Sequence, residues 1–131
     1  MGSKKMITGK KINKLAVEMN TRNHSLISGL TENLGGNDEG INPHELLEAA
    51  LAACTILTVQ MYAAKKGIAL ESTKALVKIV SEGSETRISR ELTFQGDLKP
   101  EEKTKLTEIA EKCPIHRLLQ SQVIIETSVV D

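Results

Sequence analysis

Aromatic side chains are nearly absent from this sequence, which contains no Trp, one Tyr and one Phe. Proteins that hold single-stranded nucleic acid use such rings as stacking platforms. The 17 basic residues are balanced by 17 acidic residues, so the net charge is zero and no basic stripe is available to neutralise phosphates. We therefore expect no nucleic-acid partner, and a core built from Leu, Ile, Val and Ala.

Long apolar segments are missing as well. The N-terminal residues MGSKKMITGKK are charged and lack the apolar run of a signal peptide. The longest stretch free of strongly polar side chains, residues 49–59, is shorter than the about 20 residues that a helix needs to cross a bilayer. We expect a cytoplasmic protein with no membrane partner. Its 131 residues and 40% apolar content fit a single domain, residues 1–131.

Cysteine is scarce, and neither Cys54 nor Cys113 belongs to a CxxC pair. In a reducing compartment, two such cysteines are expected to be free, catalytic or metal-binding, without a permanent structural disulfide. A purely structural interpretation also stays open, because a free cysteine is often just a small buried hydrophobic residue. A zinc site is the lesser alternative: Cys113 and His116 have a workable spacing, but the usual paired ligand clusters are missing. We predict no metal and no cofactor.

One long helix is strongly marked. Asn42 is a suitable N-cap, Pro43 fits the first helical position, and Glu45 can complete a capping box. Gly67 supplies a left-handed stop. Between residues 46 and 64 the only strongly polar side chains are Glu48 and Gln60. The pattern predicts a helix that is apolar nearly all round, buried in the core, and carries Cys54.

The remaining elements follow from alternating patterns and turn residues. Strands are expected over residues 11–20, 24–30, 70–81, 87–95 and 122–130, with two antiparallel hairpins formed by the first four. A polar loop is expected over residues 32–41. A second helix should begin near Pro100 and break at Cys113-Pro114, followed by a short helical piece over residues 115–120. The order of elements predicts an α+β domain.

A reactive thiol in apolar surroundings needs a nearby cation. Arginine suits this role, because a guanidinium stays charged when partly buried and donates several hydrogen bonds. Arg22 is the only arginine before Cys54; Arg87, Arg90 and Arg117 follow it. Lysines could serve as well, but Arg22 is the better candidate cation on chemical grounds. The alternative interpretation of Arg22 is an ordinary solvent-exposed turn residue.

Four motifs occur together in a fixed order. They are Asn42-Pro-His-Glu-Leu-Leu-Glu-Ala-Ala-Leu-Ala-Ala-Cys54-Thr, Met61-Tyr62-Ala-Ala-Lys-Lys-Gly67, the stretch from Leu92 to Leu98 with Gly96-Asp97-Leu98, and Cys113-Pro-Ile-His116-Arg117. In these motifs, and over roughly residues 12–129, the sequence resembles the family of osmotically inducible protein C and organic hydroperoxide resistance protein (OsmC/Ohr). The likeness is greatest to the OsmC-like members.

The resemblance implies a thiol peroxidase that reduces hydroperoxides, organic ones especially, in oxidative stress defence. By position in the motifs, Cys54 would be the peroxidatic thiolate that becomes a sulfenic acid. Cys113 would be the resolving thiol that forms a disulfide with it, and an external dithiol would reduce the pair. The alternative is a stress-associated dimer without enzyme activity, which binds an apolar small molecule or senses oxidants.

The resemblance also implies antiparallel sheets packed on a long central buried helix, in an intertwined homodimer with the active sites at the subunit interface. His44 stands where the characterised peroxidases have a glutamate that holds the catalytic arginine, and Glu45 lies beside it. The candidates for residues that support the site by hydrogen bonding near the thiols are His44, Glu45 and His116.

Overall fold

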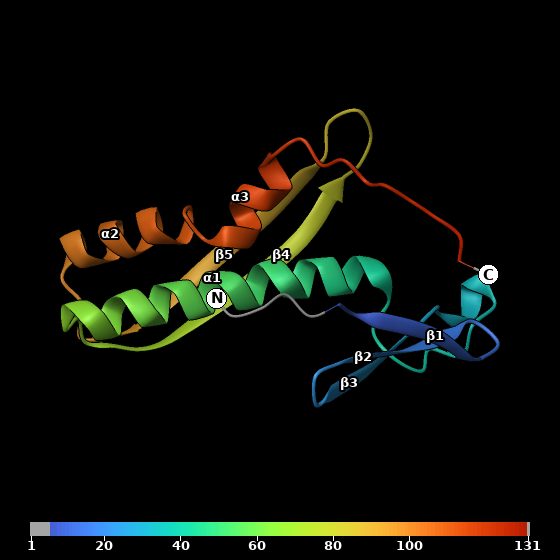
Figure 1. The fold of residues 1–131 in the computed structure, drawn as a ribbon. Helices are drawn as coiled ribbons and strands as arrows, with labels where there is room; N and C mark the ends of the chain where they lie inside the picture. Colours follow the sequence, from blue (N-terminus) through green and yellow to red (C-terminus); the bar gives the residue numbers. More distant parts are fainter. Residues whose placement is uncertain (1–5, 131) are drawn as a thin grey trace. The chain divides into compact units, whose positions relative to one another are not determined.

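The computed structural model describes residues 6–130. Its elements are β1 (Thr8–Asn13), β2 (Ala16–Thr21), β3 (His24–Gly29), the 3-10 helix η1 (Glu32–Leu34), α1 (Pro43–Lys66), β4 (Leu70–Ser81), β5 (Arg87–Gly96), α2 (Pro100–Ala110) and α3 (Pro114–Gln120) (Figure 1). Antiparallel strands combined with helices confirm the predicted α+β class. The chain forms two compact units, Met1–Leu47 and Glu48–Asp131. A single domain over residues 1–131 stays a prediction.

The first unit is a three-stranded antiparallel sheet in the order β1-β2-β3. The prediction of one continuous strand over residues 11–20 is wrong, because the chain turns at Lys14 and Leu15 and pairs back on itself. Lys14 takes a positive φ of 28° in this turn. No glycine or proline marks the position in the sequence, so the alternation of apolar residues concealed the reversal.

The loop that follows β3 contains the short helix η1 and two glycines that the fold requires. A Cβ atom would lie 2.1 Å from the Leu30 carbonyl oxygen at Gly36, and 2.1 Å from the Ile27 carbonyl oxygen at Gly40. The same unit has a hollow of about 300 Å³. Its lining is mostly apolar and includes Leu15, Val17 and Leu30.

Helix α1 begins and ends where the sequence predicts. The Glu45 N–H donates to Asn42 Oδ1 at 2.9 Å, and the Asn42 N–H donates to Glu45 Oε1 at 2.8 Å. These two bonds form the predicted capping box. Gly67, with a φ of 67°, ends the helix in the left-handed region that favours glycine.

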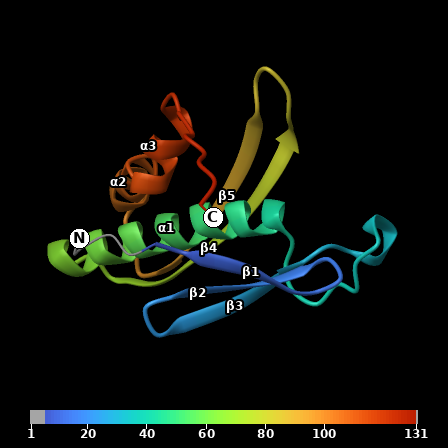
Figure 2. The same cartoon turned by 45° about the vertical axis from the view of Figure 1, so that its right-hand side comes forward.

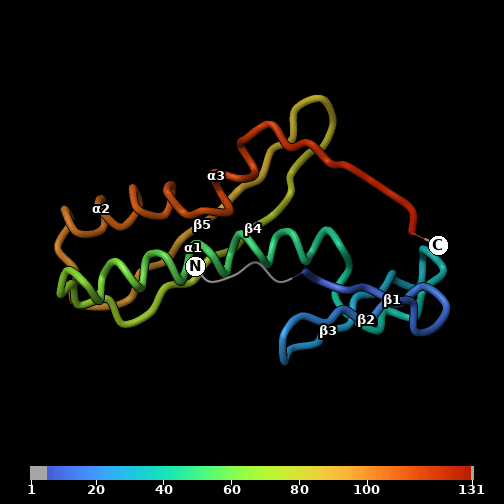
Figure 3. The backbone as a smooth tube through the Cα atoms, in the orientation of Figure 1, coloured from blue at the N-terminus to red at the C-terminus, as the bar shows by residue number. Residues whose placement is uncertain are grey.

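The second unit packs α1 and α2 against the antiparallel β4–β5 hairpin. Its buried centre consists of Val59 and Ala63 from α1 with Leu106 and Ala110 from α2, and partly buried residues of the hairpin such as Phe94 pack against it. Figures 1 and 2 show α2 next to α1. The chain bends between α2 and α3, as the tube in Figure 3 shows. The predicted break at Cys113-Pro114 is therefore confirmed.

Within the single chain, burial of the predicted apolar helix α1 is confined to one stripe. The buried residues, Leu51, Thr55, Val59 and Ala63, recur at every fourth position. On other faces Leu57 and Met61 are 67% and 57% exposed. Among residues 6–130, α1 is the one helix whose length and mean hydropathy of 1.5 would allow it to cross a membrane, a property that core helices of soluble proteins share.

The predicted strand over residues 122–130 is wrong for this chain. The segment forms neither strand nor helix, and Ile125 and Val129 are 83% and 92% exposed. Its apolar and β-branched residues have the composition of a strand, but a strand also needs a neighbouring strand edge with which to bond. Composition therefore predicted a strand, but among residues 6–130 no other strand pairs with this segment.

Candidate functional site

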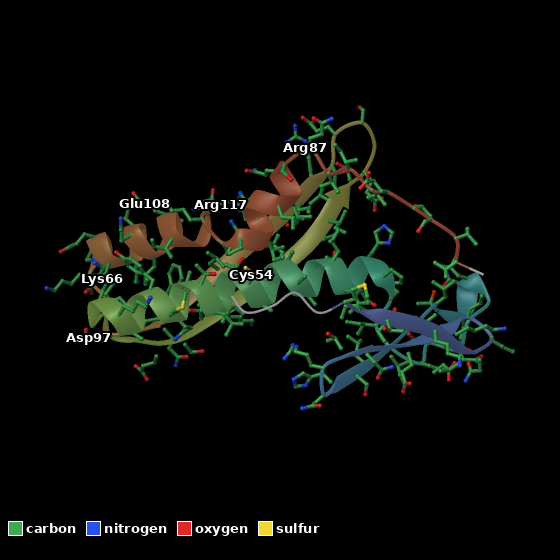
Figure 4. The ribbon with its side chains drawn as sticks, viewed as in Figure 1. Cys54, Lys66, Arg87, Asp97, Glu108 and Arg117 are labelled. Carbon is green, nitrogen blue, oxygen red and sulfur yellow. The ribbon has the colours of Figure 1, made fainter. Side chains whose placement is uncertain are left out.

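The two cysteine sulfurs are both bonded to the first turn of α3. The Ile115 N–H donates to Cys54 Sγ at 3.5 Å, and the next N–H, that of His116, donates to Cys113 Sγ at 3.3 Å. Cys54 comes from the middle of α1 (Figure 4), whereas Cys113 is the N-cap of α3. Both thiols are free. The fold thus brings together the two cysteines that the sequence analysis selected.

The two sulfurs differ in their access to solvent. Cys113 is fully buried, whereas Cys54 is partly exposed. Cys54 Sγ also lies 3.9 Å from the hydroxyl of Thr58, one turn further along α1. A small molecule from solvent can therefore reach Cys54, whereas Cys113 is inaccessible to it.

Thr55 connects the site to the buried Cys113. Its hydroxyl donates to the Leu51 carbonyl at 2.7 Å and accepts from Arg90 Nη1 at 3.0 Å. Cys113 Sγ lies 3.8 Å from the same oxygen. A threonine hydroxyl has one hydrogen, which is directed to Leu51, and two lone pairs. In this arrangement the Cys113 S–H is therefore the donor to Thr55.

Arg90 was not selected from the sequence, yet its guanidinium lies in the same cluster. Its side chain is only 10% exposed and forms an ion pair with Glu111. Arg90 Nη2 also lies 2.9 Å from His116 Nδ1. The signal that could have identified it is the alternation of β5: Arg90 shares the partly buried face with Ile88 and Leu92. A charged residue on such a face is unusual unless it is paired.

His116 takes part in this cluster through its ring. Since arginine can only donate, His116 Nδ1 accepts the bond from Arg90, and the ring proton belongs to Nε2. The carboxylate of Glu111 is 3.7 Å from the same ring nitrogen. Among residues 6–130, no group of three or more His, Cys, Asp or Glu side chains is arranged to hold a metal ion.

The other predicted site residues lie in the first unit. Arg22 is exposed in the turn between β2 and β3, with a φ of 52°. His44 is exposed in the first turn of α1, and the Glu45 carboxylate is engaged in the capping box. Their parts in the site stay predictions.

Three of the solved structures similar to this chain are described as OsmC, OsmC like or organic hydroperoxide resistance proteins. An organic hydroperoxide resistance protein OsmC from Legionella pneumophila is 21% identical, with a TM-score of 0.68 and 90% of each chain covered. An OsmC like protein from Mycoplasma pneumoniae is 18% identical, with a TM-score of 0.73 and 92% of this chain and 89% of that chain covered.

A third, an organic hydroperoxide resistance protein from Elizabethkingia anophelis, is 20% identical, with a TM-score of 0.66 and coverage of 92% and 91%. Such identities establish a shared fold and no more.

A search among curated proteins finds no match. The family model of OsmC-like proteins matches residues 35–128, which is most of the chain and includes both cysteines. The chain therefore belongs to the family of OsmC-like proteins.

Proposed function

We propose that this protein is a thiol-dependent peroxidase that reduces organic hydroperoxides in cytoplasmic oxidative stress defence, with hydrogen peroxide as a second substrate to be tested. The observation that carries the proposal is the shared turn of α3, whose consecutive N–H groups donate to an accessible sulfur and a buried one. Two of the similar structures are organic hydroperoxide resistance proteins, which supports the choice of substrate.

In the first step the Cys54 thiolate attacks the terminal oxygen of the hydroperoxide. The S–O bond forms as the O–O bond breaks, and the leaving alkoxide takes a proton to become the alcohol. The product is a Cys54 sulfenic acid. The Ile115 N–H, already directed at this sulfur, is a donor suited to an anionic thiolate. Arg22 remains the proposed cation for this step, with His44 and Glu45 as proposed supporting residues.

In the second step Cys113 attacks the sulfenic sulfur. The S–S bond forms, the S–O bond of the sulfenic acid breaks, and the thiol proton leaves with the hydroxide as water. An external dithiol then reduces the disulfide through a mixed disulfide and restores both thiols. The cycle uses no cofactor.

The test is the consumption of cumene hydroperoxide and of hydrogen peroxide by the reduced protein with a dithiol present. Cys54→Ser should lower turnover to the background rate, because the serine hydroxyl is a poor nucleophile here. Cys113→Ser should accumulate a sulfenic acid at Cys54 that dimedone traps. If the unmodified protein shows no turnover above Cys54→Ser with either peroxide, the proposal fails. The non-enzymatic alternative would then be tested by measuring the binding of apolar small molecules to the reduced protein.

We also propose a homodimer. The support is apolar surface that the single chain leaves exposed, namely Leu57 and Met61 on α1 and the apolar residues of segment 122–130. Sedimentation analysis should give twice the mass of one chain. Leu57→Glu should shift the equilibrium toward monomer, whereas the matched change Thr104→Glu, on exposed α2 surface, should not. A monomeric unmodified protein at high concentration would overturn the proposal.

A further inference from the structure

Arg90 ties together three segments of the second unit. Its guanidinium donates to Thr55 on α1 at 3.0 Å and to His116 on α3 at 2.9 Å, and it pairs with the carboxylate of Glu111 just after α2. Glu111 and His116 lie on either side of Cys113 in the sequence. One guanidinium therefore holds the segment that carries Cys113 from both sides, and also holds the threonine that Cys113 contacts.

Burial of the Arg90 guanidinium is energetically unfavourable unless its hydrogen bonds and its ion pair compensate for the lost hydration. The Arg90 side chain is 10% exposed, whereas that of Arg87, on the same strand, is 70% exposed and pairs with the exposed Glu85. A charge removed from water must be paired and hydrogen-bonded to be tolerated. The planar fork of a guanidinium can satisfy several acceptors at once, which a lysine ammonium on a flexible stem does not reproduce.

We propose that Arg90 is a positioning residue for the resolving step, in which Cys113 attacks the oxidised Cys54. Arg90 fixes the Thr55 hydroxyl so that one lone pair faces the Cys113 S–H, and it fixes α3 so that the Cys113 sulfur stays beside Cys54. The step itself is balanced within the site: the Cys113–Cys54 bond forms, the S–O bond breaks, and the thiol proton leaves in the water formed. The inference rests on the proposed function.

The contacts separate this step from the reaction with peroxide. Arg90 reaches Cys113 through Thr55, whose oxygen lies 3.8 Å from that sulfur. The sulfur of Cys54 is contacted instead by the Ile115 N–H and the Thr58 hydroxyl. Loss of the Arg90 guanidinium should therefore displace the attacking Cys113 sulfur, which also loses the fixed Thr55 hydroxyl, more than the Cys54 sulfur, whose contact with Thr58 lies within α1.

The test is a single-turnover experiment with full-length reduced protein and cumene hydroperoxide, in which peroxide loss and disulfide formation are timed separately. Arg90→Gln should slow disulfide formation by at least about tenfold, as expected when an attacking group is misplaced. Peroxide loss should change by less than about twofold, because the contacts of the Cys54 sulfur with the Ile115 N–H and the Thr58 hydroxyl do not involve the Arg90 side chain. Dimedone should trap sulfenic acid at Cys54. Arg90→Lys should not restore the second step, and Arg87→Gln is the matched control for both steps.

A second variant and a second reaction test the role of Arg90 without removing its side chain and without peroxide. Glu111→Gln, at a side chain that is 62% exposed, weakens the same ion pair without opening the core and should slow only disulfide formation, by about twofold to fivefold. Release of thionitrobenzoate from a Cys54 mixed disulfide measures attack by Cys113 without any peroxide. This reaction still tests Arg90 if the peroxidase proposal fails. Equal slowing of both steps in Arg90→Gln, or no slowing of Cys113 attack in either variant, would overturn the inference.

Discussion

Thr55→Val should destabilise the reduced protein by about 2 to 3 kcal/mol, although the two side chains have almost the same shape. Thr55 is fully buried, and its hydroxyl accepts from the charged Arg90 at 3.0 Å and contacts the thiol of Cys113 at 3.8 Å. A hydrogen bond to a charged group contributes about 1.5 to 3 kcal/mol, and the donors left without it remain buried. The weaker thiol contact adds little to this sum.

The assay is urea unfolding of the reduced protein, followed by circular dichroism at one fixed protein concentration, because dimerisation would make the stability depend on concentration. Thr55→Ser is the control: it keeps the hydroxyl and loses one methyl group, which should cost about 1 kcal/mol. Thr55→Ser should also retain fast disulfide formation, whereas Thr55→Val should not. A Thr55→Val protein within about 0.5 kcal/mol of the unmodified protein, at an unchanged m-value, would refute the reasoning.

Two further predictions concern the scaffold that carries the site. Leu106→Ala should destabilise the protein by about 2 to 5 kcal/mol in the same unfolding assay, because the Leu106 side chain is fully buried against α1. The control Leu118→Ala, at an exposed position, should cost less than about 1 kcal/mol. Equal effects of the two substitutions would contradict the described core. Asn42→Ala should lower the free energy of unfolding by about 0.5 to 2 kcal/mol, because α1 loses its N-cap. Asn42→Asp keeps a side-chain acceptor and should retain most of that stability. Equal stabilities of the two variants would argue against the capping box.

The sequence predicted best those features that depend on neighbouring residues. The bounds of α1 follow from Asn42, Glu45 and Gly67, whose bonds and dihedral angle act within one turn of the helix end. The predicted range of β4 also matches the structure. By contrast, the turn at Lys14 was missed because its positive φ has no glycine to announce it. The segment 122–130 was misassigned because pairing, which decides whether an extended segment is a strand, depends on residues elsewhere in the chain or in another chain.

In the candidate site, too, the residues identified by local sequence patterns were predicted, and the residue identified by distant contacts was not. Both cysteines could be selected from motif and residue type, because each one ends or begins a recognisable local pattern. Arg90 could not, since its partners Thr55, Glu111 and His116 are separated from it by 35, 21 and 26 positions. Periodicity shows only that Arg90 faces inward on β5; which acceptors it meets depends on how three helical segments pack over that strand. A search limited to arginines before Cys54 therefore selected Arg22. It did not consider Arg90, whose guanidinium bonds the threonine that contacts Cys113. An inward-facing charge on an otherwise apolar strand face is the pattern that such a search should include, because burial of that charge requires partners that only the assembled fold supplies.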